Sequence, residues 1–367
     1  MHPGEYRAPR LVGILAVVTL IAAACGGTAA PSSSPAASVA ASSSGAASGN
    51  IVLPKPEKTD IVLGFSAISS PSTGDLVRAS NPFKKYGLNV TFQVFNGAAA
   101  AMQALLAGQV DVSDNSEGPV LATVPTSSPT QYVMITRAND SDILYSQANI
   151  KTAADLKGKT IAVSSFGSNS YAGAIYALKA LGLTDKDVTI TAVGNDTQRL
   201  AALKSGAVSA SIQDNTREKE LNGLGYNSLV RLADIKPAFG QPGASLVAPV
   251  DFIKKYPNTT LAIVAGYMEA NWMMQTAKPA DLVPFMKQTY DKMTDAELID
   301  AITLAQQEPW TPKDGQCRAE DVQFGWQIAQ VANPALKDVD PLKICNNDFV
   351  NKLKDLGLQK KLGIPGY

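Results

Sequence analysis

Short β-branched runs and stretches of helical spacing alternate along the chain, and polar loops follow the apolar runs. Four runs have the apolar pattern of buried strands: 61–65, 90–95, 110–112 and 159–163. Stretches with apolar residues at helical intervals follow them: 75–86, 98–106 and the segment that begins at Tyr171. Strands joined by helices in this order favour parallel pairing and right-handed crossovers. The pattern therefore predicts an α/β fold whose polar loops gather where strands end.

Two groups of strands are expected, because the pattern breaks and then starts again. Strand-like runs at 132–136 and 143–145 have the position of a crossover out of a first lobe, and 245–248 has the position of a return to it. A largely helical stretch, 251–307, comes next. We therefore expect the following division: lobe 1 from 58–148 and 245–310, lobe 2 from 149–244, and a C-terminal helical tail, 311–367, packed on lobe 1.

The N-terminal segment has the composition of a secretion signal. Arg7 and Arg10 precede an uncharged apolar run, 11–24, that is short for a membrane span. Cys25 follows three alanines, which is typical of a bacterial lipoprotein in which this cysteine is lipidated. An ordinary signal peptide with an incidental cysteine is the alternative. Residues 26–50 are almost entirely Ala, Ser, Gly and Pro without a charge, the composition of a flexible tether.

These features predict a lipid-anchored protein on the extracytoplasmic face of the cell membrane. The expected segments are a signal peptide at 1–24 and a lipidated, flexible linker at 25–57. In an exported chain, Cys317 and Cys345 are expected to form a structural disulfide. Their spacing is not the C-x-x-C spacing of a reactive pair, which argues against a redox role.

Charge and composition exclude several classes of function. The 32 basic and 32 acidic residues give a net charge of zero, so the chain has no basic footprint for nucleic acid. The single histidine, His2, lies in the expected signal peptide. The expected mature chain therefore lacks the base of Ser-His-Asp and Cys-His systems and the common ligands of zinc. We expect no catalysis, no metal and no cofactor.

Several segments resemble a known family. DLKGK followed by TIAV, Gly167-Ser168 at a helix start, LKALGL with DVTI, and RLAALKSGAVSASI are similar to the solute-binding proteins of ABC importers. KKYGLNVTFQVFNG and ALLAGQVDVSDNSEGP are similar to the first lobe of the same family, so the resemblance covers about 58–290. The nearest group binds aliphatic sulfonates, nitrate, taurine and thiamine pyrimidine precursors.

The resemblance implies a two-lobed periplasmic-binding-protein fold of type II, in which each lobe is a mixed sheet flanked by helices. It also implies a monomer that captures a small molecule by hinge closure and delivers it to an ABC-type permease in the membrane. A pyrimidine-precursor synthase shares this fold, but the sequence lacks the histidine and the cysteine-rich motif of that enzyme. An extracellular sensor without a permease is another alternative.

Candidate ligand-binding residues lie at strand ends and helix starts, where backbone N–H groups and hydroxyls are available. In lobe 1 they are Ser66, Ser69, Asn96, Asp114, Asn115 and Glu117. In lobe 2 they are Ser164, Ser165, Phe166, Ser168, Asn169, Tyr171, Asn195, Gln213, Asp214 and Asn215. Any one serine or asparagine here can instead be a helix cap or a turn residue, and the phenylalanines can be core residues.

The residue types favour a neutral heteroaromatic ligand that is rich in hydrogen-bond donors, and riboflavin above others. The carboxylates of Asp114 and Glu117 would repel an anion, and helical spacing places Arg78 and Arg199 on solvated faces. Four aromatic side chains near the loops would stack on a flat ring: Phe65, Phe95, Phe166 and Tyr171. The serine-rich loop 164–170 suits an anion instead, so a thiamine pyrimidine precursor and an aliphatic sulfonate, taurine or nitrate stay as alternatives.

Overall fold

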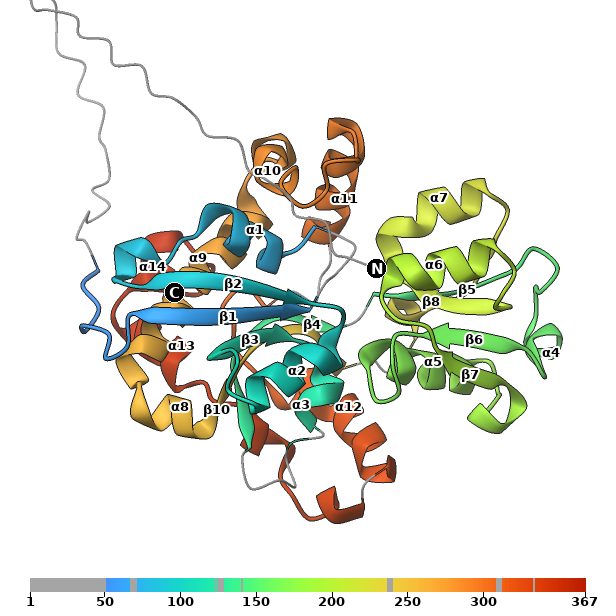
Figure 1. The fold of residues 1–367 in the computed structure, drawn as a ribbon, viewed down its shortest axis with the longest axis horizontal. Helices are drawn as coiled ribbons and strands as arrows, with labels where there is room; N and C mark the ends of the chain where they lie inside the picture. The colour runs from blue at the N-terminus through green and yellow to red at the C-terminus, as the bar shows by residue number, and fades with distance from the viewer. Residues whose placement is uncertain are drawn as a thin grey trace, which may run out of the picture. The chain divides into compact units, whose positions relative to one another are not determined.

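The computed structural model describes two five-stranded sheets and the helices around them (Figure 1). The described residues are 51–66, 71–121, 123, 129–139, 141–235, 240–307, 312–332 and 334–367. The expected signal peptide, Cys25 and most of the expected linker lie outside these ranges.

The first sheet has the order β2-β1-β3-β10-β4. Its strands are β1 (Asp60–Ser66), β2 (Asn89–Phe95), β3 (Val112–Asn115), β4 (Thr130–Asn139) and β10 (Gly240–Pro249). β1 is parallel to both β2 and β3, whereas β10 runs antiparallel to β3 and β4. The parallel strands therefore bring the ends of β1 and β3, with their polar residues, to one edge of the sheet.

The second sheet has the order β7-β6-β8-β5-β9. Its strands are β5 (Ile143–Ser146), β6 (Thr160–Val163), β7 (Thr189–Ala192), β8 (Ala210–Gln213) and β9 (Asn227–Arg231). β6 is parallel to β7 and β8, and β5 is antiparallel to β8 and β9. Two mixed sheets flanked by helices confirm the predicted fold class.

The boundary between the lobes differs from the sequence-based division. β5 was expected at the end of lobe 1, but it lies in the second sheet, where Leu144 is opposite both Ile212 and Val230. β10 begins at Gly240 in the first sheet, before the expected return at 245. Sequence pattern alone does not separate the two assignments, because a buried strand has the same apolar run in either sheet.

The helices cover both sheets (Figure 1). The helices in the lobe that contains the first sheet are α1 (Thr73–Ser80), α2 (Ala98–Leu106), α3 (Glu117–Leu121), α8 (Val250–Lys255), α9 (Pro257–Thr276), α10 (Pro279–Met286), α11 (Asp295–Gln307), α12 (Ala319–Ala332), α13 (Asp348–Asp355) and α14 (Leu358–Leu362). Those among the strands of the second sheet are α4 (Ala153–Leu156), α5 (Asn169–Ala180), α6 (Asp196–Lys204) and α7 (Glu218–Gly223). None of the described helices is both long enough and apolar enough to cross a membrane.

The end of the expected linker is part of the first lobe. Glu57 accepts hydrogen bonds from the backbone N–H groups of Asn258 and Thr259, at 3.1 and 2.9 Å, and so caps the N-terminus of α9. Ile51 and Leu53 pack against the core of this lobe. Residues 51–57 were assigned to the linker, but their packing places them with the folded lobe.

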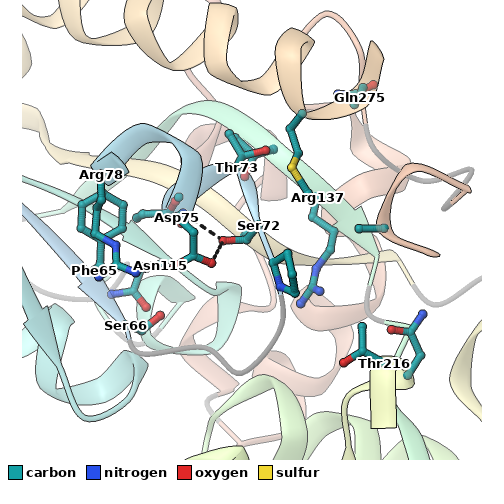
Figure 2. A pocket seen from close by; sticks show the side chains of 18 residues that line it. Phe65, Ser66, Ser72, Thr73, Asp75, Arg78, Asn115, Arg137, Thr216 and Gln275 are labelled. Atoms are coloured by element: carbon teal, nitrogen blue, oxygen red, sulfur yellow. Dashed lines mark hydrogen bonds and ion pairs between the residues drawn. The ribbon is translucent and has the colours of Figure 1, made fainter. Parts of the chain in front are cut away.

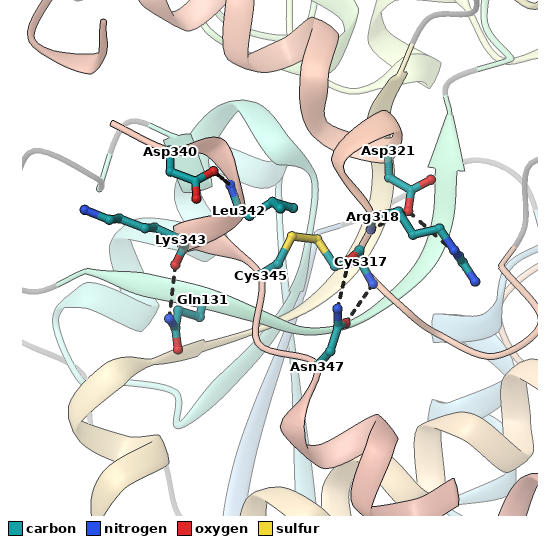
Figure 3. The surroundings of a disulfide bond; sticks show 9 residues. All are labelled: Gln131, Cys317, Arg318, Asp321, Asp340, Leu342, Lys343, Cys345 and Asn347. Carbon is teal, nitrogen blue, oxygen red and sulfur yellow. Dashed lines mark hydrogen bonds and ion pairs between the residues drawn. A yellow bond between two sulfur atoms is a disulfide. The ribbon is translucent and has the colours of Figure 1, made fainter. Parts of the chain in front are cut away.

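The C-terminal tail packs on the first lobe and contains a disulfide (Figure 3). Cys317 is bonded to Cys345, with their Cα atoms 5.6 Å apart. The Asn347 amide bonds to both backbone polar groups of Cys317, at 2.9 Å in each case. Trp326 of α12 belongs to the same buried cluster as Tyr132 of β4. The tail thus lies against β4, which also contributes to the site described below.

We expect opposite effects from two glycine-to-alanine substitutions in helices. A Cβ on Gly266 of α9 would lie 2.6 Å from the ring of Phe83, which is buried and cannot move aside. Gly266→Ala should therefore cost about 1–3 kcal/mol of stability through overpacking, more than the roughly 1 kcal/mol gained from helix propensity. Gly223→Ala in α7 meets no atom within 4 Å and should be neutral or stabilising. Unfolding of the two variants in denaturant measures the change in their free energy of unfolding. Equal changes in the two variants would contradict the prediction.

Candidate functional site

A pocket lies where β1 and β3 end, and α1, β4 and α9 close around it (Figure 2). Its volume is about 900 Å³, which includes space open to solvent. The lining residues are Phe65, Ser66, Pro71, Ser72, Thr73, Gly74, Asp75, Arg78, Asp114, Asn115, Thr136, Arg137, Asn215, Thr216, Ala244, Met274, Gln275 and Ala305. Asn215 and Thr216 follow β8 of the second sheet, so both lobes contribute to the pocket.

The first turn of α1 forms one wall. Ser72 is the N-cap: its Oγ accepts a hydrogen bond from the Asp75 N–H at 3.2 Å and donates to Asp75 Oδ2 at 2.8 Å. A Cβ on Gly74 would lie only 2.8 Å from Asp114 Oδ2 and 3.2 Å from the Phe65 ring. Glycine at position 74 therefore lets the helix approach the end of β3 closely.

Asp75 is held by several groups. Its side chain is almost completely buried, it forms an ion pair with Arg78, and it accepts a hydrogen bond from the Tyr290 hydroxyl at 2.9 Å. The guanidinium of Arg78 also lies over the ring of Phe65, 5.6 Å from its centroid. Arg78 was expected on a solvated face, but these contacts place it in the pocket wall. The expectation was wrong because helical spacing does not show which side of a short helix meets the sheet edge.

Asp114 is the second buried carboxyl of the pocket. The Tyr267 hydroxyl of α9 donates a hydrogen bond to its Oδ2 at 3.1 Å. Burial raises the pKa of Asp114 to about 7, and the charge of Asp75 adds to the increase, while the hydrogen bond from Tyr267 and the charges of Arg137 and Arg78 oppose it. Near neutral pH this carboxyl is therefore only partly ionised.

Four charged side chains thus line the pocket: Asp75, Arg78, Asp114 and Arg137. Asp75 and Arg78 offset each other as an ion pair, and Asp114 carries only part of a negative charge near pH 7. Arg137 extends from β4 across the pocket in Figure 2. The guanidinium groups of Arg78 and Arg137 can donate paired hydrogen bonds to a negatively charged group of a ligand.

Four of the expected ligand-binding residues line this pocket: Ser66, Asp114, Asn115 and Asn215. Asn115 is almost fully buried and uses its amide on the backbone, donating to Ala98 O at 3.1 Å and accepting from Ser116 N at 2.9 Å. Asn115 thus shapes the loop. Ser69 and the side chain of Glu117 lie outside the described residues.

The serine-rich loop of lobe 2 does not line the pocket in this structure. Ser168 is the N-cap of α5 and accepts from Tyr171 N at 3.2 Å. The Ser170 hydroxyl lies 2.9 Å from that of Ser164 and accepts from Ser164 N at 2.8 Å. These hydroxyls are therefore engaged within the loop, as the cap-and-turn alternative expected. The Ser165 carbonyl accepts from Ser168 Oγ at 2.7 Å.

The aromatic side chains of that loop and of the start of α5 also lie outside the pocket lining. Phe166 is 65% exposed and packs edge-on against Tyr171, with 5.6 Å between the ring centroids. Neither ring is part of the pocket lining. Phe65 lines the pocket, but Arg78 lies over its ring. A flat ligand therefore has no free aromatic face among the lining residues that the structure describes.

Other expected residues have local structural roles. Gln213 is fully buried and bonds to the Ser211 hydroxyl at 2.7 Å. Asp214 caps the turn that follows β8 by accepting from Thr216 N at 3.0 Å. Arg199 was expected on a solvated face but is 6% exposed, and its Nε donates to the Ile212 carbonyl at 2.9 Å. The buried polar groups here bond to one another, as buried polar groups must.

Three expected residues, Asn96, Asn169 and Asn195, link the lobes outside the pocket. Asn195 caps α6 and also donates from Nδ2 to Asn96 Oδ1 at 2.9 Å. Asn169 accepts from the Gly118 N–H of α3 at 3.4 Å. A Cβ on Gly118 would lie 1.8 Å from the Gly167 carbonyl oxygen, so only glycine permits this approach. These residues contribute to the contact between lobes.

Sequence reasoning missed much of the pocket. The missed lining residues include Ser72, Thr73, Asp75, Arg78, Thr136, Arg137, Thr216, Met274 and Gln275. The spacing of Ser72 and Asp75 matches an N-capping pattern after a strand and loop, which marks the helix start that faces the pocket. Thr136 and Arg137 have no comparable signal, because they lie inside a strand.

Comparison with known proteins identifies relatives of the chain. Residues 54–283 match the model of the NMT1-like family. A protein of Bordetella bronchiseptica has a similar solved structure, with a TM-score of 0.72 and 23% identity over 84% of this chain and 100% of that one. No match to a curated protein was found.

Two further solved structures carry names that state a ligand. The alkanesulfonate-binding protein SsuA of Xanthomonas axonopodis pv. citri, bound to MOPS, aligns with a TM-score of 0.63 and 17% identity over 77% of this chain and 95% of that one. The periplasmic nitrate-binding protein NrtA of Synechocystis PCC 6803 aligns with a TM-score of 0.66 and 15% identity over 85% and 91%. At these identities the likeness shows a common fold.

We expect Asp114→Asn to stabilise the empty protein increasingly as pH rises. The pKa of Asp114 is about 7 in the folded protein and near 3.8 when unfolded, so its favourable contribution is complete below about pH 4 and is lost as pH rises through 7. The variant's melting temperature relative to the parent should rise between pH 4 and pH 8. The exposed Asp291→Asn is the control and should show no such trend. A pH-independent difference for Asp114→Asn would contradict the prediction.

Proposed function

Because the chain belongs to the NMT1-like family, we propose that it is the solute-binding component of an ABC-type importer. The fold of two mixed sheets supports this role, as do similar structures whose names state sulfonate and nitrate binding. The observation that carries the proposal is the pocket to which both lobes contribute, with four charged side chains in its lining. Ligand capture by hinge closure would bury the solute there, and a membrane permease would receive it.

The proposed ligand is a small organic anion of the sulfonate type. Arg78 and Arg137 both line the pocket, and Arg guanidinium groups match the oxygen pairs of such anions. The partial protonation of Asp114 near neutral pH removes much of the repulsion that was expected from sequence. Nitrate, which is an inorganic oxyanion, and taurine, whose sulfonate group is negative and whose amine is positive, belong to the same proposal because a guanidinium group can bind either oxyanion.

Riboflavin and a thiamine pyrimidine precursor remain the competing ligands. The case for riboflavin depended on free aromatic faces, whereas the ring of Phe65 lies under Arg78 and the exposed ring of Phe166 is outside the pocket lining. The pocket therefore supports a flat vitamin less well than an anion. A direct comparison of the affinities for these ligands decides between the anions and the heteroaromatic vitamins.

The proposal places the protein outside the cytoplasmic membrane, tethered through Cys25. The uncharged stretch 26–50 would connect the lipid to the folded part that begins near Ile51. At about 5–6 Å × √n, such a tether reaches roughly 25–30 Å, enough to separate the lobes from the bilayer surface. We propose that the tethered protein is a monomer.

We expect Arg137→Gln to weaken sulfonate binding at least about tenfold, because the variant loses a guanidinium that can donate paired, charge-assisted hydrogen bonds to the sulfonate oxygens. Calorimetric titration of the ligand-stripped protein with ethanesulfonate, taurine, nitrate, riboflavin and the pyrimidine precursor gives the affinities. Arg318→Gln, which removes an arginine outside the pocket lining, is the control and should bind like the parent. Saturable binding of riboflavin together with no binding of any anion would refute the anion proposal and leave the transport role intact.

We expect Cys25→Ala to release the protein from membranes. If Cys25 carries the lipid, its loss removes the anchor while the two lobes stay folded. Fractionation of cells that express each form measures the partition between membrane and soluble fractions. Membrane retention of the variant would show that another segment anchors the chain.

A further inference from the structure

The backbones of the two lobes meet at Gly118. This residue lies in α3 of the first lobe, whereas Gly167 and Ser168 lie just before α5 of the second lobe. A Cβ built on Gly118 would lie 1.8 Å from the Gly167 carbonyl oxygen, 2.9 Å from the carbonyl carbon and 3.3 Å from the Cα of Ser168. All three are backbone atoms, so no side chain can rotate to make room. The absence of a side chain at position 118 therefore determines how closely the lobes approach each other.

Hydrogen bonds accompany this approach. The Gly118 N–H donates to Asn169 Oδ1 at 3.4 Å, and Asn169 is 8% exposed. Asn195, the N-cap of α6 in the second lobe, donates to Asn96 Oδ1 at 2.9 Å, and Asn96 directly follows β2 of the first sheet. Single hydrogen bonds of this kind contribute little net free energy each. They can therefore form and break as the lobes close and open.

The contact at Gly118 acts on a segment that lines the pocket. Asn115, at the end of β3, lines the pocket and precedes Gly118 by only three residues. The second lobe contributes Asn215 and Thr216 to the same pocket. The chain passes between the two sheets after β4 and again before β10, which allows the lobes to move as separate bodies. The approach at Gly118 thus sets the distance between the two walls of the pocket.

We propose that Gly118 is a positioning residue for solute capture, because the lobes can close only until α3 meets the backbone at Gly167. This inference rests on the proposed function and identifies the contact that limits closure. Gly118 is not among the pocket-lining residues. The apparent affinity for a ligand is reduced by the fraction of protein that reaches the binding-competent form. A substitution at position 118 therefore changes the affinities of all ligands by one common factor.

The first test measures affinity. The parent and Gly118→Ala, both stripped of ligand, are titrated calorimetrically with ethanesulfonate and with taurine. Both affinities should fall at least about tenfold in the variant, and their ratio should stay within about twofold of the parent ratio. Gly223→Ala is the matched control and should bind like the parent, because a Cβ there meets no atom within 4 Å. A changed ratio in Gly118→Ala would overturn the inference, since the residue would then act on the contacts of one ligand.

The second test measures the distance between the lobes. Lys219 of α7 and Asp300 of α11 are exposed residues of different lobes, and their charged atoms lie 3.3 Å apart. Spin labels are attached to Lys219→Cys and Asp300→Cys in the Cys25→Ala background, in which the other two cysteines are joined in the disulfide. Electron paramagnetic resonance then gives the distance distribution with and without the two sulfonates. Gly118→Ala should lower the ratio of short to long distances at least about tenfold, and Gly223→Ala should leave it unchanged.

A milder variant guards against misfolding of Gly118→Ala. Asn96→Ala removes a hydrogen bond between the lobes without adding an atom. It should lower the ratio of short to long distances about two- to fivefold and leave the melting temperature nearly unchanged. If Gly118→Ala does not fold, the distance distribution of Asn96→Ala decides, and an unchanged distribution overturns the inference.

The outcomes separate this inference from the proposed function. A parent that shows only long distances under every condition overturns the inference, as does an unchanged distribution in Gly118→Ala. If Gly118→Ala loses the short distances but neither sulfonate binds the parent, the positioning role stands and the proposed anion class fails. If both sulfonates bind the parent and Gly118→Ala with equal affinity, the anion class stands and the positioning role fails.

Discussion

The burial of two carboxyl groups beside one another, Asp75 and Asp114, is the constraint on which the pocket depends. Each needs compensation because a buried charge is costly. Asp75 receives an ion pair from Arg78 and hydrogen bonds from Ser72 and Tyr290, while Asp114 receives a hydrogen bond from Tyr267 and titrates near pH 7. Satisfying these groups brings α1 and α9 to the edge of the first sheet, and the remaining space is the pocket.

This arrangement has consequences for the ligand that the pocket prefers. Compensation within the wall leaves Asp75 and Arg78 nearly neutral as a pair, and the carboxyl of Asp114 has a pKa of about 7. An anion near Arg137 would favour the protonated form of Asp114, since like charges disfavour ionisation. The pocket therefore accommodates a negative group although it contains as many carboxyl groups as guanidinium groups.

The regular elements could be predicted from sequence, whereas most of the site could not. The strands around 61–65, 90–95 and 159–163 and the helix at 98–106 are close to their predicted bounds, because period and propensity are local properties. The serine-rich loop was expected to bind the ligand, but Ser168 caps α5 and Ser170 bonds to Ser164. A hydroxyl that can satisfy its own turn has the same sequence signature as one that binds a solute.

The sequence by itself determined the fold class, the family and the loops at strand ends, since these follow from hydrophobic period, strand order and recognisable segments. Tertiary structure decided which of these loops faces the pocket. It brought Arg78 against Phe65 and Asp75 and placed β5 in the second sheet. These outcomes depend on pairing register and on close approach at Gly74, which are contacts between segments far apart in the chain and leave no local pattern.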